Sequence, residues 1–208
     1  MIILNALIAG SALSYILADQ RRHHFLRYIF KPLTMLLICL LAIQSSGISP
    51  FYKDLVIAGL IFSLFGDIFL MLPTDRFIAG LSSFLIAHLF YSAAFASKLE
   101  GISWWPLLPF LACGILLFST LASFLGTMKW PVLIYSIVIS VMAWLACEWM
   151  LQTGSNAALL AFSGAILFVI SDAILALNRF RWPFRTAQIF IMSTYFAAQW
   201  FIASSIQG

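Results

Sequence analysis

Two aspartates, Asp67 and Asp172, each lie inside a long apolar run of this 208-residue sequence. A carboxyl group at membrane depth costs at least ~2.5 kcal/mol on insertion scales, so it normally faces a polar cavity or a partner and marks a functional site. Asp67 lies five residues before the end of its run, and Asp172 lies six residues before the end of its own. At about 1.5 Å per residue, we expect both carboxyl groups about 8–9 Å inside the same membrane face.

Two carboxyl groups that share a cavity can divide the work of acid/base catalysis. Burial disfavours the charged form of a carboxyl group, and a second carboxylate nearby disfavours it further. Such a pair can hold one protonated acid beside one ionised base, which is the arrangement that acid/base hydrolysis needs. Two other interpretations stay open: each aspartate only bonds neighbouring helices together, or the pair relays protons.

Four more polar side chains are predicted to bind the substrate in the same cavity, deeper than the carboxyl groups. His88 and Tyr91 are three residues apart, and Tyr195 and Gln199 are four apart. Each spacing places two side chains on one face of a helix. His88 alone is more typical of a residue that links helices than of a catalyst, so we assign it to binding.

Three further polar features lie near the ends of the apolar runs. Asn178 ends the run that holds Asp172, and we predict that it contacts a polar head group or caps its helix. Glu148 falls near the opposite membrane face, where water is expected to reach it, and we interpret it as a snorkelling or structural residue. The longest loop, Asp19 to Lys31, is basic and would attract anionic lipid head groups, although membrane topology alone accounts for its charge.

The composition identifies an integral membrane protein. Hydrophobic residues make up 63% of the chain and charged residues only 9%, whereas soluble domains carry about 25% charged residues. The runs lack the period-two alternation of barrel strands, so we predict an all-α polytopic protein with one membrane domain over residues 1–208. Eight apolar runs are each near the length of a transmembrane helix: Ile2 to Ala18, Pro32 to Ser46, Asp54 to Leu72, Phe77 to Ser97, Trp105 to Leu125, Pro131 to Leu151, Ala157 to Asn178 and Phe184 to Ser204.

The basic residues follow a strong topological bias, which explains the net charge of +4 better than nucleic-acid binding does. Alternate loops of a multi-pass protein lie on the same side of the membrane, and one such set of loops contains only two basic residues, Lys53 and Lys98. Because Lys and Arg mark cytoplasmic loops, we predict a multi-pass protein of the bacterial inner membrane with both termini outside the cytoplasm. The other set of loops holds nine basic residues: Arg21, Arg22, Arg27, Lys31, Arg76, Lys129, Arg179, Arg181 and Arg185.

The two aspartates lie in similar sequence contexts. The segment Tyr-Ser-Ala-Ala-Phe begins 24 residues after Asp67, at Tyr91, and the segment Tyr-Phe-Ala-Ala-Gln begins 23 residues after Asp172, at Tyr195. This spacing indicates a tandem repeat with possible halves 1–100 and 101–208. Because the offset is four spans, the halves would share one orientation. We therefore expect the two carboxyl groups to face each other across a pseudo-twofold axis.

Several common catalytic and metal-binding motifs are absent from the sequence. It contains no HExxH, no GxSxG, no phosphate-binding glycine loop and no Cys/His metal spacing. We therefore predict no metal and no cofactor. The three cysteines lie singly in apolar runs and are interpreted as small packing residues.

Four segments carry a family resemblance: Leu-Phe-Gly-Asp-Ile-Phe-Leu-Met-Leu-Pro at 64–73, Phe-Ile-Ala-Gly-Leu-Ser-Ser-Phe-Leu-Ile-Ala-His-Leu-Phe-Tyr at 77–91, Gly-Ala-Ile-Leu-Phe-Val-Ile-Ser-Asp-Ala-Ile-Leu-Ala at 164–176 and Tyr-Phe-Ala-Ala-Gln at 195–199. They resemble the YhhN family of membrane proteins, which includes the mammalian transmembrane lysoplasmalogenases. The resemblance implies an eight-span hydrolase that cleaves the vinyl ether bond of a lysoplasmalogen. Its products would be a fatty aldehyde and a glycerophospho head group, such as glycerophosphoethanolamine or glycerophosphocholine.

Under this hypothesis Asp67 and Asp172 are the catalytic pair, and the partners are a lysophospholipid substrate and the lipid bilayer. The residues do not decide which aspartate is the acid or how many copies of the chain assemble. A transporter for a small molecule or for protons, using the same two aspartates, is the alternative. It requires a water path to both membrane faces, whereas a hydrolase requires a pocket that is closed on the non-cytoplasmic side.

Overall fold

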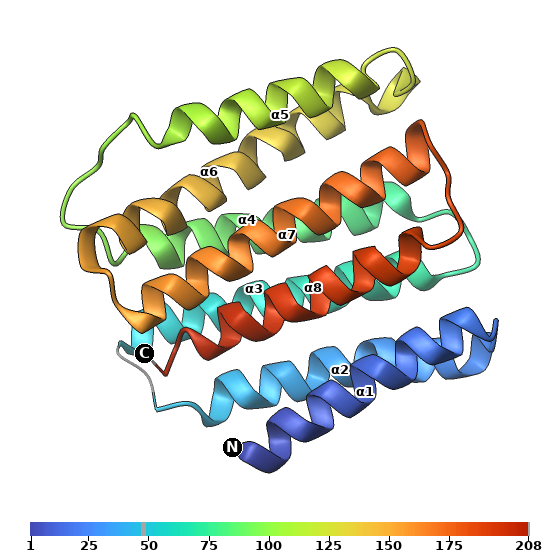
Figure 1. The fold of residues 1–208 in the computed structure, drawn as a ribbon, viewed down its shortest axis with the longest axis horizontal. Coiled ribbons are helices and arrows are strands. Elements are labelled where there is room, and N and C mark those ends of the chain that lie inside the picture. The colour runs from blue at the N-terminus through green and yellow to red at the C-terminus, as the bar shows by residue number, and fades with distance from the viewer. Residues whose placement is uncertain (47–48, 208) are drawn as a thin grey trace.

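A computed structural model describes residues 1–46 and 49–207 of the chain, which form a bundle of eight α-helices (Figure 1). This confirms the predicted all-α class. One turn of 3-10 helix, Gly126–Met128, precedes α6. The helices are α1 Ile2–Gln20, α2 His24–Gln44, α3 Pro50–Met71, α4 Phe77–Ala96, α5 Leu107–Leu121, α6 Lys129–Thr153, α7 Asn156–Phe180 and α8 Ala187–Ser204.

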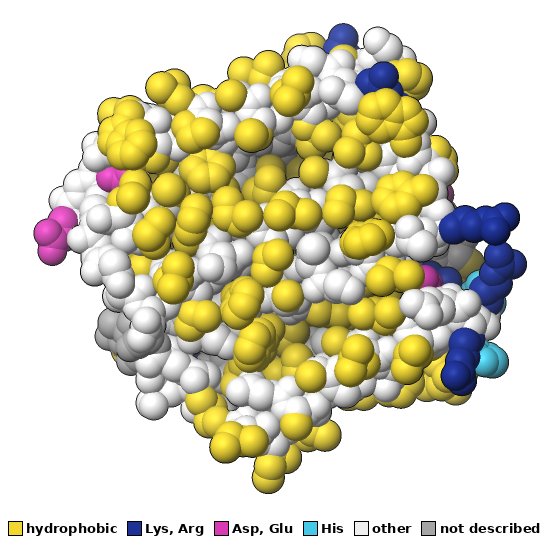
Figure 2. Space-filling view, viewed as in Figure 1, with side chains coloured by type: hydrophobic (Ala, Val, Ile, Leu, Met, Phe, Trp, Pro, Cys, Tyr) yellow, Lys and Arg dark blue, Asp and Glu magenta, His cyan; other side chains and the backbone are white. Residues whose placement is uncertain are grey.

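Six of the helical segments are long and apolar enough to cross a membrane: α1, α2, α3, α4, α7 and Gly126–Thr153, which contains α6. Helix α5 is a shorter apolar helix. Hydrophobic side chains cover the visible side of the bundle, and Lys and Arg gather at one end of it (Figure 2). Both termini lie at the opposite end (Figure 1). The chain is therefore a multi-pass membrane protein, and the assignment of its basic end to the cytoplasm stays a prediction.

Helix α2 starts earlier than predicted, and this changes the site. Pro32 was expected to begin a helix, but α2 begins at His24 and contains Pro32 in its interior. Membrane helices tolerate an internal proline because neighbouring helices and local adjustments satisfy the freed backbone groups. Lys31, which was predicted to lie in a loop, is therefore a helical residue, and its side chain is buried.

The predicted span Trp105 to Leu125 was also wrong in length. Helix α5 covers only the 15 residues Leu107–Leu121, which correspond to about 22 Å at 1.5 Å per residue. Helix α5 is therefore shorter than the hydrocarbon core of a membrane, which is about 30 Å thick. Helix α5 packs mainly on α6 and lies at the outer edge of the bundle (Figure 1).

The aspartate-bearing helices α3 and α7 each pack closely on the helix that follows them. The contacts are made at Gly59 and Gly164, each eight residues before its aspartate. A Cβ atom added to Gly59 would lie 2.3 Å from the ring of Tyr91, and one added to Gly164 would lie 2.9 Å from the carbonyl oxygen of Ala198. Small residues allow membrane helices to approach in this way. The shared spacing supports the tandem repeat, which stays a prediction.

We expect Gly164→Ala to destabilise the bundle, because the new methyl group would meet backbone atoms of α8 that cannot move aside. Overpacking of this kind costs roughly 1–3 kcal/mol. Thermal unfolding of the detergent-solubilised protein would measure the effect as a lower Tm. Gly10→Ala is the control, because a Cβ at this helical glycine meets nothing within 4 Å. Equal Tm values for the two variants would contradict the close packing.

Candidate active site

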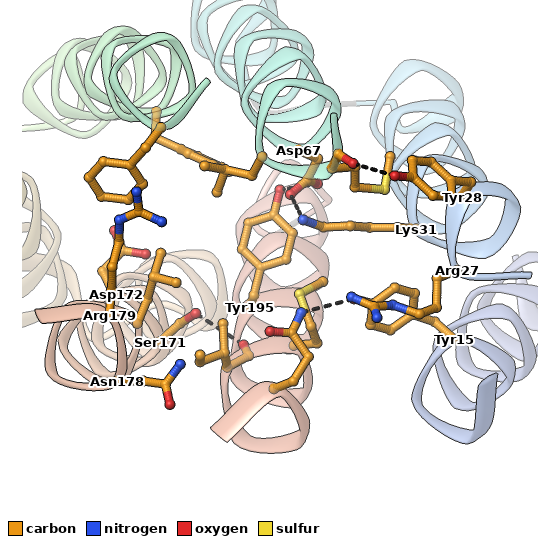
Figure 3. A pocket seen from close by; sticks show the side chains of 18 of the residues that line it. Tyr15, Arg27, Tyr28, Lys31, Asp67, Ser171, Asp172, Asn178, Arg179 and Tyr195 are labelled. Carbon is orange, nitrogen blue, oxygen red and sulfur yellow. Dashed lines mark hydrogen bonds and ion pairs between the residues drawn. The ribbon is translucent and has the colours of Figure 1, made fainter. Parts of the chain in front are cut away.

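A cavity of about 460 Å³ lies toward the basic end of the bundle, between α1, α2, α3, α4, α7 and α8. Both predicted catalytic residues, Asp67 and Asp172, line it. Two of the predicted substrate-binding residues, Asn178 and Tyr195, also line it (Figure 3). The structure therefore brings the two acidic spans to one polar space, as the sequence predicts.

Asp67 is held by two charge-compensating contacts inside this cavity. Its Oδ1 lies 2.9 Å from Nζ of Lys31, and its Oδ2 accepts a hydrogen bond of 2.7 Å from the Tyr195 hydroxyl. Asp67 is only 1% exposed and Lys31 only 5%. In Figure 3 the Lys31 side chain reaches from α2 toward Asp67, beside the ring of Tyr195. A buried pair of this kind is stable only when geometry and added hydrogen bonds offset desolvation.

Asp172 has a different environment. It is half-buried, and its Oδ2 accepts a hydrogen bond from the hydroxyl of Tyr135 on α6. Among the ion pairs of residues 1–46 and 49–207, none includes Asp172. Asp67 therefore lies beside a cation, whereas Asp172 lies beside a neutral hydroxyl group.

Lys31 and Tyr135 are two residues of the site that were not predicted from the sequence. Lys31 was treated only as a marker of topology, because the helix was expected to begin one residue later. The spacing of Lys31, Thr34 and Ile38 nevertheless places them on one helical face, and all three are buried. Tyr135 had no comparable signal, since its contact with Asp172 depends on how α6 packs against α7.

The mouth of the cavity is built around Arg179 and Asn178. Arg179 forms an ion pair of 2.8 Å with Asp75, and its guanidinium lies 4.0 Å from the ring centre of Phe77. The pKa of the exposed Asp75 carboxyl is lowered below its ordinary value. The largest cause is the hydrogen bond from the backbone N–H of Phe77, and the second is the hydrogen bond and positive charge of Arg179. Asn178 Oδ1 accepts a 3.0 Å hydrogen bond from the backbone N–H of Phe184, so Asn178 both lines the cavity and holds the α7–α8 loop.

His88, Tyr91 and Gln199 do not line this cavity, contrary to the placement expected from helical spacing. All three are fully buried. The Tyr91 hydroxyl donates a 2.7 Å hydrogen bond to Gln199 Oε1. The ring of His88 packs 4.6 Å from that of Phe168 and 5.2 Å from that of Tyr135, measured between ring centres. They form a packed layer within the bundle, and a substrate-binding role for them stays a prediction.

Glu148 was expected to be reached by water, and this was wrong because it is only 2% exposed. Its Oε1 accepts hydrogen bonds of 3.0 Å from the Ser103 backbone N–H and from Gln152 Nε2. Its structural role is confirmed, since these bonds attach the α4–α5 loop to α6. Within the described residues, no group of three or more His, Cys, Asp or Glu side chains is arranged to hold a metal ion.

The helical bundle and its acidic cavity define a multi-pass membrane protein with a polar site inside the membrane domain. Residues 26–206 match the sequence model of the YhhN family. Because this match covers most of the chain, the protein belongs to the YhhN family. The resemblance identified from the four sequence segments is thereby confirmed.

Relatives of the chain include bacterial and mammalian proteins. The Escherichia coli O157:H7 protein named "Uncharacterized membrane protein YhhN" is 35% identical over 190 residues, which cover 91% of each chain. Human "Lysoplasmalogenase TMEM86A" is 34% identical over 156 residues, covering 72% of this chain and 64% of its own length. Mouse "Lysoplasmalogenase TMEM86B" is 35% identical over 179 residues, covering 81% of this chain and 69% of its own length. No solved structure matches the chain significantly.

We expect Lys31→Met to destabilise the fold by roughly 3–5 kcal/mol, because it leaves the Asp67 carboxylate buried without its cation. Denaturant unfolding in detergent micelles would measure the loss. The double variant Lys31→Met, Asp67→Asn should recover much of the stability, since no buried charge remains. Arg27→Met is the control: it removes a more exposed ion pair with Asp19, which is worth only about 0–1 kcal/mol. A Lys31→Met protein as stable as this control would contradict the buried pair.

The ion pair at the cavity mouth predicts a specific pH dependence. Because the pKa of Asp75 is lowered in the folded protein, its stabilising effect is present at neutral pH and is lost as the pH falls through that lowered pKa. Wild type and Asp75→Asn should therefore differ slightly in Tm at pH 7 and converge in acid. A difference that persists unchanged at low pH would contradict this assignment.

Proposed function

We propose that this protein is a membrane-embedded hydrolase that cleaves the vinyl ether bond of a lysoplasmalogen to a fatty aldehyde and a glycerophospho head group. The observation that carries the proposal is one cavity with two carboxyl groups in unequal environments, Asp67 beside Lys31 and Asp172 beside Tyr135. The names of the mammalian relatives support the choice of reaction. Glycerophosphoethanolamine and glycerophosphocholine are the expected head-group products.

The reaction needs one proton donor and one activated water. Protonation of the β-carbon of the vinyl ether gives an oxocarbenium ion, and water adds to its α-carbon to give a hemiacetal. The hemiacetal then loses the glycerol oxygen as an alcohol and becomes the aldehyde. The sum is one vinyl ether plus one water giving one aldehyde plus one alcohol. General acid/base catalysis of such a step contributes typically 10²–10⁴-fold.

The unequal environments divide these two roles. The Lys31 ammonium favours the ionised form of Asp67, and the Tyr195 hydroxyl fixes the orientation of that carboxylate. Asp67 is therefore assigned as the base that stabilises the cation and activates water. Asp172 has no cationic partner among the described residues, so no neighbouring positive charge favours its ionised form. Asp172 is assigned as the proton donor.

Basic side chains at the cavity mouth suit the phosphate of the head group. His24, Arg27 and Arg179 line the cavity together with the catalytic pair. Arg27 and Arg179 each use part of their guanidinium on an aspartate, and the five N–H donors of Arg leave others for an anionic ligand. We therefore expect the phosphate toward the basic end and the ether bond toward the bundle interior.

The alternative of a transporter lacks support from the arrangement of these residues. It would require a polar path that continues from the cavity to the opposite face. The buried layer of His88, Tyr91, Gln199 and Phe168 lies outside the cavity lining. The closed pocket that a hydrolase needs is the better match, with its mouth at the basic end.

Release of fatty aldehyde from a purified vinyl ether lysolipid tests the proposal. We expect Asp67→Asn and Asp172→Asn to lose about 100-fold or more of the activity, because each removes one acid/base group while keeping side-chain size. Asp54→Asn is the matched control, since Asp54 is an exposed residue of the same helix α3. Absence of aldehyde from the folded wild type, with every vinyl ether lysolipid head group, would sink the proposal.

A further inference from the structure

A second, apolar cavity adjoins the cavity lined by Asp67 and Asp172, which we call the acidic cavity. It has a volume of about 160 Å³ and lies between α4, α5, α6 and α7. Five residues line both cavities, and among them Asp172 is the only acid. The carboxyl group assigned as proton donor therefore lies where a polar space meets an apolar one. The other four shared residues are Leu70, Phe77, Phe84 and Leu175.

The walls of this second cavity suit a hydrocarbon chain. Residues such as Phe110, Ile139 and Val169 line it, and Asp172 is the only charged residue among them. Its lining serines, Ser136 and Ser140, donate their hydroxyl hydrogens to backbone carbonyl groups of their own helix, at 2.8 and 2.7 Å. The hydroxyl groups are thus already satisfied, and the cavity offers few sites for a polar ligand.

The position of α5 leaves this cavity accessible from the bilayer. Helix α5 packs mainly on α6 and makes only slight contact with α7. It has a single buried residue, Leu121, and lies at the outer edge of the bundle (Figure 1). A chain already dissolved in the hydrocarbon of the membrane can therefore reach the space between α5 and α7 without passing through water.

We infer that the space between α5, α6 and α7 holds the part of the substrate's single hydrocarbon chain that is next to the vinyl ether bond. The chain enters sideways from the bilayer, where its remainder stays, and the vinyl ether bond lies beside Asp172. This inference rests on the proposed hydrolase function and adds the chain-binding subsite to it. The head group lies in the acidic cavity, and the bond to be cleaved lies at the junction. A chain gains little by moving from lipid into protein, so the subsite positions the bond more than it raises affinity.

Narrowing the chain subsite should select against long chains. Val169 lies on α7 one turn before Asp172 and lines the apolar cavity, so Val169→Trp would narrow that cavity. We expect kcat/KM for an octadecenyl lysoplasmalogen to fall about tenfold more than kcat/KM for a propenyl analogue, whose chain is too short to fill the cavity. Ile170→Trp is the matched control, because Ile170 is the next residue and is 41% exposed on the outside of the bundle. Equal losses for the two chain lengths would overturn the inference, and Leu117→Trp on α5 repeats the test from the facing wall.

Photolabelling of the wild type separates this inference from the proposed function, since it needs no turnover. The probe is a saturated 1-O-alkyl lysophosphoethanolamine with a diazirine in the part of its chain next to the ether bond. We expect labels on Phe110, Ile139 and Val169 that excess unlabelled lysolipid prevents. Such labels would support the subsite even if no aldehyde were released in the activity assay. Labels confined to outward residues such as Ile170, and unaffected by competitor, would overturn the subsite even in an active hydrolase.

Discussion

The buried ion pair between Lys31 and Asp67 is the interaction on which the site depends. Each of these charges costs several kcal/mol to remove from water, even after relaxation. The fold must therefore bring the ammonium, the carboxylate and the Tyr195 hydroxyl together at once. These groups come from α2, α3 and α8, which pack against one another. The same contacts that make the charges tolerable also form one wall of the cavity.

The pair also makes the two aspartates unequal. If both carboxyl groups had the same neighbours, nothing would decide which one holds a proton. Lys31 stands beside Asp67, whereas Asp172 has the neutral hydroxyl of Tyr135 and lies where the polar and apolar cavities adjoin. An amphiphilic substrate has its own polar and apolar ends, and its ether bond lies between them. The asymmetry of the site therefore corresponds to the asymmetry of a lysolipid.

The long apolar runs of the sequence predict the all-helical fold. An aspartate inside such a run predicts a functional position, because a carboxyl group is costly at membrane depth. The partners of the aspartates could not be predicted in the same way. The helical position of Lys31 was not predicted, because Pro32 follows it and proline is common at the first position of a helix. In the structure Pro32 lies inside α2. Tyr135 belongs to a helix whose rotation against α7 is set by packing. Helical spacing showed that His88 shares a face with Tyr91, but not that this face meets packed rings.

Infrared spectroscopy of the carboxyl groups tests the central claim most directly, because a protonated carboxylic acid absorbs apart from a carboxylate. The spectrum should be recorded at neutral pH for the wild type, Asp67→Asn and Asp172→Asn. We predict a protonated carboxyl band in the wild type that survives in Asp67→Asn and disappears in Asp172→Asn. A band that disappears in Asp67→Asn and survives in Asp172→Asn would contradict the assignment of acid and base.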